Sequence, residues 1–118
     1  MLERDIVAAI LHLLRKTPGC FAWKEHGGMY GTSGIPDIIA CYRGRFVAFE
    51  VKTPTGKLTK LQEITMQQII EAKGQAFKVT SAAEVAAILK ELEGFLYGFP
   101  EEHRKGISQS GIPTGTAD

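Results

Sequence analysis

The chain has 118 residues, of which 44% are hydrophobic, and its 14 basic and 13 acidic residues give a formal net charge of +1. This length and composition suit one small domain with a hydrophobic core, and the near-neutral charge does not by itself indicate a nucleic-acid binder. No apolar run approaches the roughly 18 residues of a membrane span, and the first residues lack the order of a signal peptide, so we expect a cytoplasmic or otherwise intracellular protein without a membrane segment.

The N-terminal third predicts one helix, one strand and one loop. Apolar residues recur with a helical period over residues 2–16, and a cation, a proline and a glycine follow at the end of this run. Residues 20–26 are rich in strand-forming side chains. Four glycines within residues 27–34 exclude a regular element there.

Four side chains of the next segments are predicted to belong to the core. Cys20 and Cys41 form no zinc-binding pattern and stand in apolar, strand-like surroundings, which favours small buried residues. We expect the aromatic rings of Phe21 and Trp23 to be buried as well, rather than to stack on a ligand.

Residues 37–53 predict a β-hairpin, and the hairpin predicts a reactive site. If residues 43–44 form a two-residue turn, Asp37 lies opposite Glu50, within roughly 5 Å on one face. Lys52 points the same way as Glu50, because side chains alternate along a strand. Facing carboxylates repel each other. A divalent cation would neutralise them, and carboxylate oxygen suits Mg²⁺ or Mn²⁺.

The rest of the chain predicts a helix, a strand and a second helix. A Thr-x-x-Gln capping box begins a helix over residues 60–73, which Gly74 ends as the C′ residue. Residues 75–80 predict a short strand, and a Ser-x-x-Glu capping box begins a helix over residues 81–93. The order is therefore α-β-β-β-α-β-α. It predicts an α/β fold in which helices flank a mixed central sheet.

We expect residues 1–93 to form the domain and residues 94–118 to form a tail. The tail is rich in turn-forming residues after an aromatic stretch, and it would pack on the domain or on a second subunit.

The two strings Gly34-Ile35-Pro36-Asp37 and Glu50-Val51-Lys52, in this order of elements, resemble the PD-(D/E)xK nuclease superfamily and, more narrowly, the VRR-NUC nucleases. The resemblance covers about residues 2–90 and includes Glu3 in the first helix and Gln62 in the second. It implies a restriction-endonuclease-like core and a DNA endonuclease that depends on Mg²⁺ or Mn²⁺.

The resemblance also implies roles for single residues. Asp37 and Glu50, with the Val51 carbonyl and Glu3, would bind the metal. Glu3 has an alternative role, because a carboxylate in the first turn favours the helix dipole.

Two further side chains complete the catalytic set implied by the resemblance. Lys52 would orient the attacking water and stabilise charge on the phosphate, while a role as general base stays open. Gln62 would contact water or phosphate, although the capping box alone accounts for a glutamine at this position.

DNA contacts are expected on both sides of this set. Lys57, Lys60 and the amides that begin the 60–73 helix would meet phosphates. The glycine-rich loop would let a DNA strand come close to its backbone at Ser33 and Gly34. An ordinary flexible connector is the alternative for this loop.

The resemblance implies that a stand-alone domain of this size is a homodimer that acts on branched DNA such as Holliday junctions, since two sites related by a two-fold axis can cut two symmetric strands. Phages and mobile elements commonly carry such genes. A flap- or nick-directed nuclease with a partner protein, and a DNA-binding module without catalysis, are the alternatives.

Overall fold

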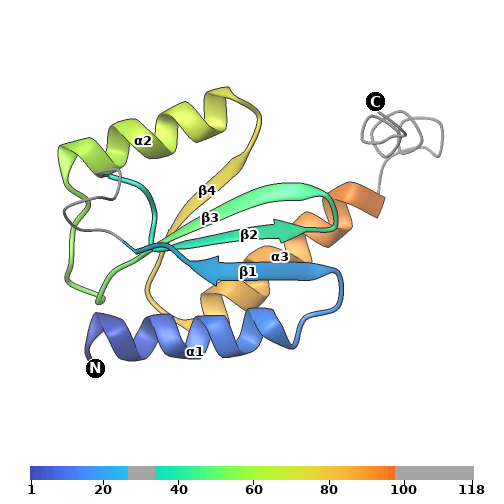
Figure 1. Cartoon of the computed structure of the whole chain (residues 1–118), viewed down its shortest axis with the longest axis horizontal. Helices are drawn as coiled ribbons and strands as arrows, with labels where there is room; N and C mark the ends of the chain where they lie inside the picture. Colours follow the sequence, from blue (N-terminus) through green and yellow to red (C-terminus); the bar gives the residue numbers. More distant parts are fainter. Residues whose placement is uncertain (27–33, 98–118) are drawn as a thin grey trace. The chain divides into compact units, whose positions relative to one another are not determined.

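The computed structural model describes residues 1–26 and 34–97. Seven elements follow one another along the chain (Figure 1): α1 (Glu3–Arg15), β1 (Cys20–Lys24), β2 (Ile38–Tyr42), β3 (Arg45–Val51), α2 (Lys60–Glu71), β4 (Gln75–Val79) and α3 (Ala82–Tyr97). This order confirms the predicted α-β-β-β-α-β-α arrangement. The chain divides into two compact units, Met1–Val85 and Ala86–Asp118. Helix α3 runs past its predicted end, and the remainder of the predicted tail lies outside the described residues.

The four strands form one mixed sheet in the order β1-β2-β3-β4. β1 and β2, and β2 and β3, are antiparallel, whereas β3 and β4 are parallel. Tyr42 pairs with Arg45, which confirms the predicted two-residue turn. Both turn residues have positive φ, 50° for Arg43 and 86° for Gly44, as a type I′ hairpin requires.

Helices α1 and α2 lie on opposite sides of the sheet (Figure 1). On the α2 side, Met66 packs with three residues that share one row across the sheet, Ile39, Ala48 and Ala76. On the α1 side the helix buries five apolar residues at helical spacing, Ile6, Val7, Ile10, Leu11 and Leu14. The strand face on that side is fully buried at Ile38, Val47, Phe49 and Val51. The central strand β3 therefore has apolar cover on both faces.

Three helix ends test the predicted capping. Thr59 and Gln62 form the predicted capping box of α2. At the other end of α2, Lys73 takes the left-handed conformation with a φ of 76°, so the prediction of Gly74 as the C′ residue is wrong. Gly74 is required for space instead, because a Cβ there would come within 2.9 Å of Ile69. Ahead of α3, the Ser81 hydroxyl accepts the Glu84 N–H, as predicted, but the Glu84 carboxylate accepts the Thr80 N–H in place of the Ser81 N–H, so only half of the predicted capping box forms.

The prediction of four core residues is wrong for three of them. Phe21 is 71% exposed and Trp23 39% exposed, and Cys41 is exposed too. Cys20 is partly buried. Phe21 and Trp23 lie on the edge strand β1, and Cys41 lies opposite Phe21 on β2, away from the row that Met66 of α2 covers. Strand propensity alone does not tell a covered face from an open one. Among the described residues, no helix is both long enough and apolar enough to cross a bilayer.

Candidate active site

The hairpin brings Asp37 next to Glu50. Ile38 pairs with Phe49, so Asp37 falls opposite Glu50 in the same register. The Asp37 carboxylate accepts the Val51 N–H at 2.8 Å, which fixes its side chain against β3. On the other side, the Asp37 carbonyl accepts the Glu25 N–H at 2.8 Å, so the residue is held between two strands.

Glu50 is the one charged side chain that is buried within residues 1–26 and 34–97, at 3% exposure. Two side chains approach the same oxygen of its carboxyl group. Gln62 donates from Nε2 to Oε2 at 3.0 Å, and the Lys52 Nζ lies 3.8 Å from Oε2. Lys52 is itself largely covered, with 13% of its side chain exposed. Asp37, Glu50, Lys52 and Gln62 therefore meet in one small region at the end of β3.

The electrostatics of this cluster disfavour a charged Glu50. Burial raises the pKa of Glu50 to about 8, and the charge of Asp37 and a hydrogen bond with it add to the effect. Lys52 acts in the opposite direction and lowers this pKa. Glu3, in the first turn of α1, raises it, so its charge reaches the cluster although its side chain is exposed.

Gln62 holds two roles at once. Its Oε1 accepts the Thr59 N–H at 2.9 Å to close the capping box, while its Nε2 donates to Glu50. The expected contact of Gln62 with water or phosphate stays a prediction, and the side chain already reaches a carboxylate of the cluster. Gln62 thus connects the start of α2 to the acidic pair and fixes the rotamer of Glu50.

The donor atoms of this cluster fit a hard divalent cation. Two neighbouring carboxylates, one of them buried, need positive charge to be ionised together. The Val51 N–H points toward Asp37, and in a regular strand the carbonyl of a residue points to the same side as its N–H. In the part of the chain that is described, no three His, Cys, Asp or Glu side chains are grouped to surround a metal. Mg²⁺ does not need such a group, because it binds one or two carboxylates and retains waters.

The residues expected to touch DNA lie near the start of α2. Lys57 and Lys60 are exposed, in the loop before α2 and at its first residue. Gly34 has a φ of 83°, and a Cβ there would meet the Leu61 side chain at 2.8 Å. Close packing on α2 thus already requires a glycine at this position. Ser33 lies outside the described residues.

Sequence reasoning gave no role to Glu25. Its backbone holds Asp37, and its side chain accepts the Trp23 indole N–H at 2.7 Å. The pairing of β1 with β2 puts Glu25 in the same row of the sheet as Asp37 and Glu50. The two-residue turn was enough to align β2 with β3. The glycine-rich connection between β1 and β2 is too long to predict which residues of these two strands pair.

Comparisons with known proteins identify the fold. No protein-family model matches the sequence, and no curated protein matches it either. A solved structure described as a "VRR_NUC domain" is similar, with a TM-score of 0.63 and 21% sequence identity over 75% of this chain and 94% of that one. At this identity the similarity concerns the fold, and it confirms the restriction-endonuclease-like arrangement expected from the sequence.

Proposed function

We propose that this chain is a nuclease of the VRR-NUC type, which hydrolyses phosphodiester bonds of DNA at the cluster of Asp37, Glu50 and Lys52. One observation carries the proposal. A buried glutamate stands beside a second carboxylate and a largely covered lysine, and such groups are rarely buried without a function. The fold shared with a VRR_NUC domain supports the same conclusion.

Asp37 and Glu50 would hold a divalent cation, Mg²⁺ or Mn²⁺, with the Val51 carbonyl as a further ligand and Glu3 at the margin. When bound, such an ion supplies charge stabilisation and a more acidic water. The hydrogen bond from the Val51 N–H orients the Asp37 carboxylate before any ligand arrives. Gln62 does the same for Glu50.

Lys52 would orient the attacking water and stabilise negative charge on the phosphate. Its ammonium group lies beside Glu50, so it stands where water and phosphate oxygen would be bound. Little of the side chain is exposed, and an ammonium that is shielded from bulk water acts more strongly on a neighbouring charge.

The DNA would lie across the start of α2. Lys57 and Lys60 provide positive charge there, and the first amides of a helix favour anions. We propose branched DNA, such as a four-way junction, as the substrate, cut by two copies related by a two-fold axis.

A cleavage assay tests the proposal. The protein is incubated with a four-way junction, a flap, a nicked duplex, a linear duplex and a single strand, with Mg²⁺, Mn²⁺ or a chelator. Junction cleavage that the chelator removes supports the proposal. Flap preference would favour a partner-dependent nuclease, and DNA binding without cleavage would favour a non-catalytic module.

Substitutions assign the chemistry to the cluster. Asp37→Asn and Lys52→Ala should each lower cleavage by more than about a hundredfold while DNA binding persists. Lys90→Ala, an exposed lysine of α3, is the control and should cleave normally. Near-normal turnover of the Lys52 variant would show that the site is wrongly assigned.

A further inference from the structure

Helix α2 covers only part of the sheet face that carries the candidate active site. Residues directly opposite each other in a sheet point to the same side. Trp23 pairs with Ile39, and Ile39 pairs with Ala48. Met66 of α2 packs on that row, so α2 lies on the same face as Trp23, where it also contacts β4. The β1 part of this face is left open, and Phe21 and Trp23 stand on it, 71% and 39% exposed.

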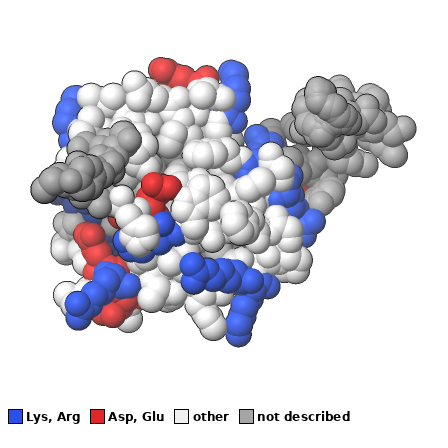
Figure 2. Space-filling model, in the orientation of Figure 1, with Lys and Arg blue, Asp and Glu red and all other residues white. Residues whose placement is uncertain are grey.

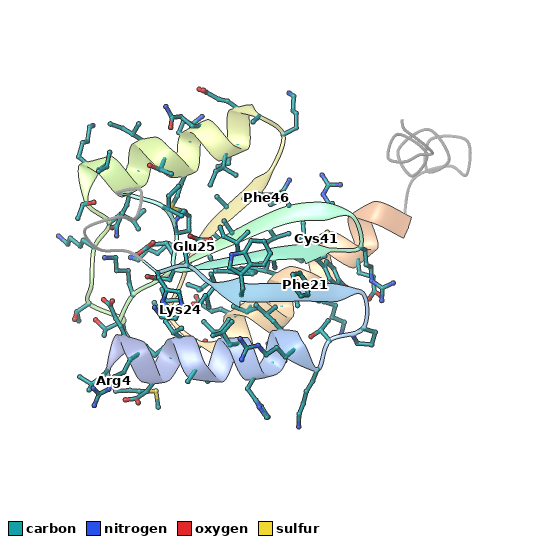
Figure 3. The ribbon with its side chains drawn as sticks, viewed as in Figure 1. Arg4, Phe21, Lys24, Glu25, Cys41 and Phe46 are labelled. Atoms are coloured by element: carbon teal, nitrogen blue, oxygen red, sulfur yellow. The ribbon has the colours of Figure 1, made fainter. Side chains whose placement is uncertain are left out.

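The open part of this face is aromatic. The ring centroids of Phe21 and Trp23 are 5.6 Å apart, and the ring planes are inclined at 47°. Phe21 pairs with Cys41, and Cys41 pairs with Phe46, so a third exposed ring lies on the same face. Figure 2 shows mainly uncharged side chains over this region, and Figure 3 shows Phe21, Cys41 and Phe46 across it. Exposed rings that stand together in this way indicate an interaction surface.

The rings lie close to the two carboxylates of the candidate active site. Glu25, two residues after Trp23, is in the same row as Asp37 and Glu50. Two strand spacings of about 4.8 Å and two residues of about 3.4 Å put the Cα atoms of Trp23 and Glu50 about 12 Å apart. At about 3.4 Å per stacked nucleotide, a DNA strand spans that distance with about three or four nucleotides. A strand bound at the carboxylates can therefore reach both rings.

The Trp23 ring is held in place before any ligand arrives. Its indole N–H donates to the Glu25 carboxylate at 2.7 Å. A ring that is already oriented loses little conformational freedom when a base stacks on it. The Lys24 Nζ lies 3.4 Å from the Glu25 carbonyl, so a cation stands at the same end of β1 as this carboxylate (Figure 3). This end of β1 therefore combines an oriented ring with a positive charge for the phosphate of a stacked nucleotide.

We propose that Phe21 and Trp23 stack on unpaired bases of the DNA substrate, close to the phosphate that is cut. Every base has a π-face, so the two rings would hold a strand without reading its sequence. In a duplex the neighbouring base pairs cover these π-faces. The rings would therefore favour DNA with single-stranded nucleotides beside the cleavage site over fully paired DNA. This inference rests on the proposed function and names the feature of the branched substrate that the face recognises.

The position of the rings favours bases over a protein segment as their occupant. Either could cover apolar rings, but this face is continuous with the cluster at which we propose that a phosphate binds. Gln62, at the start of α2, reaches that cluster through Glu50. A strand that enters past the start of α2 and leaves the cluster toward β1 would pass over the rings. A protein segment bound there would instead compete with the substrate.

Fluorescence provides a direct test, because Trp23 is the single tryptophan of the chain and its emission reports on this face. The titrations contain a chelator and no divalent metal, so that no strand is cut. A single-stranded oligonucleotide and a duplex with a single-stranded arm should quench the emission, and a blunt duplex of the same length should not. An arm of abasic sites keeps the phosphates but lacks the bases, and it should bind about tenfold more weakly.

Substitutions of Phe21 separate base stacking from apolar contact. Phe21→Tyr keeps a ring and should bind the duplex with the single-stranded arm normally. Phe21→Leu keeps an apolar side chain, and it should bind this duplex about tenfold more weakly and discriminate less against the abasic arm. Ile70→Ala, 47% exposed near the C-terminal end of α2, is the matched control and should bind normally. Circular dichroism checks that each variant folds, and the abasic arm tests the same point on the natural chain.

The outcomes separate this inference from the proposed function. Equal quenching by the blunt duplex, or equal binding of the normal and the abasic arm, would overturn the stacking role. An emission of Trp23 that shifts with protein concentration in the absence of DNA would assign the face to a second copy and overturn it as well. Quenching by unpaired DNA in a chain that cuts no DNA would support stacking and overturn the catalysis alone. Normal cleavage without quenching would overturn the stacking alone.

Discussion

Replacing Glu50 with glutamine should make the metal-free protein more stable at alkaline pH. The folded protein raises the pKa of Glu50 from its ordinary value of 4.5 to about 8, chiefly because the carboxyl group is buried and Asp37 stands beside it. Below pH 4.5 the group is protonated in the folded and the unfolded chain alike. Between about 4.5 and 8 only the unfolded chain releases the proton, so stability falls as the pH rises through this window.

The size of the effect follows from the width of the window. A change in pKa of this extent corresponds to at most about 5 kcal/mol. The Lys52 Nζ lies 3.8 Å from Glu50, and its favourable charge is already included in this pKa. Water that enters around the ionised Glu50 carboxylate would reduce the loss of folding stability, so we expect a loss of about 2–4 kcal/mol. The amide of Glu50→Gln is neutral at every pH and can still accept from Gln62, so the variant avoids this loss.

Urea unfolding at pH 5 and pH 8.5 in the presence of a chelator measures the difference. The variant and the natural chain should be similarly stable at pH 5, and the variant should be more stable by about 2–4 kcal/mol at pH 8.5. Glu63→Gln, at an exposed position of α2, is the matched control and should show no such change. A Glu50→Gln variant that is less stable than the natural chain at pH 8.5 would show that the buried Glu50 carboxylate does not destabilise the fold at this pH.

Three further predictions concern α2 and the loop before it. Gln62→Glu should retain the capping box but lower cleavage, since a carboxylate would face Glu50, whereas Gln62→Ala should also lower stability by about 1 kcal/mol, which thermal unfolding checks. Lys57→Ala combined with Lys60→Ala should weaken DNA binding and reduce the slope of log K against log salt by about 2, and an unchanged slope in an anisotropy titration would remove both lysines from the interface. Gly34→Ala should destabilise the domain by about 2 kcal/mol or more in urea unfolding, because of its positive φ and the nearby Leu61 side chain.

Local chemistry made much of the fold predictable. The register of β2 and β3 follows from the turn at Arg43 and Gly44, because a two-residue turn leaves one way to pair the flanking strands. The same register put Asp37 opposite Glu50. The start of α2 was predictable for a similar reason, since Thr59 and Gln62 satisfy each other's backbone groups within one turn.

Features that depend on distant parts of the chain were not predictable. Whether Phe21 and Trp23 are covered depends on how far α2 extends over the sheet, and strand periodicity does not contain that information. The contact of Gln62 with Glu50 likewise depends on the angle at which α2 leaves the loop. The roles assigned to Lys52, to the metal ligands and to the DNA-contacting residues stay predictions, because the position of a side chain does not by itself give its chemical role.

A crystal structure of the protein soaked with Mn²⁺, with the ion located by its anomalous scattering, shows whether Asp37 and Glu50 share a metal ion. We expect one strong peak within coordination distance, about 2.2 Å, of carboxylate oxygens of both Asp37 and Glu50. A peak elsewhere, or none at this position in crystals that hold Mn²⁺ at other sites, would contradict it.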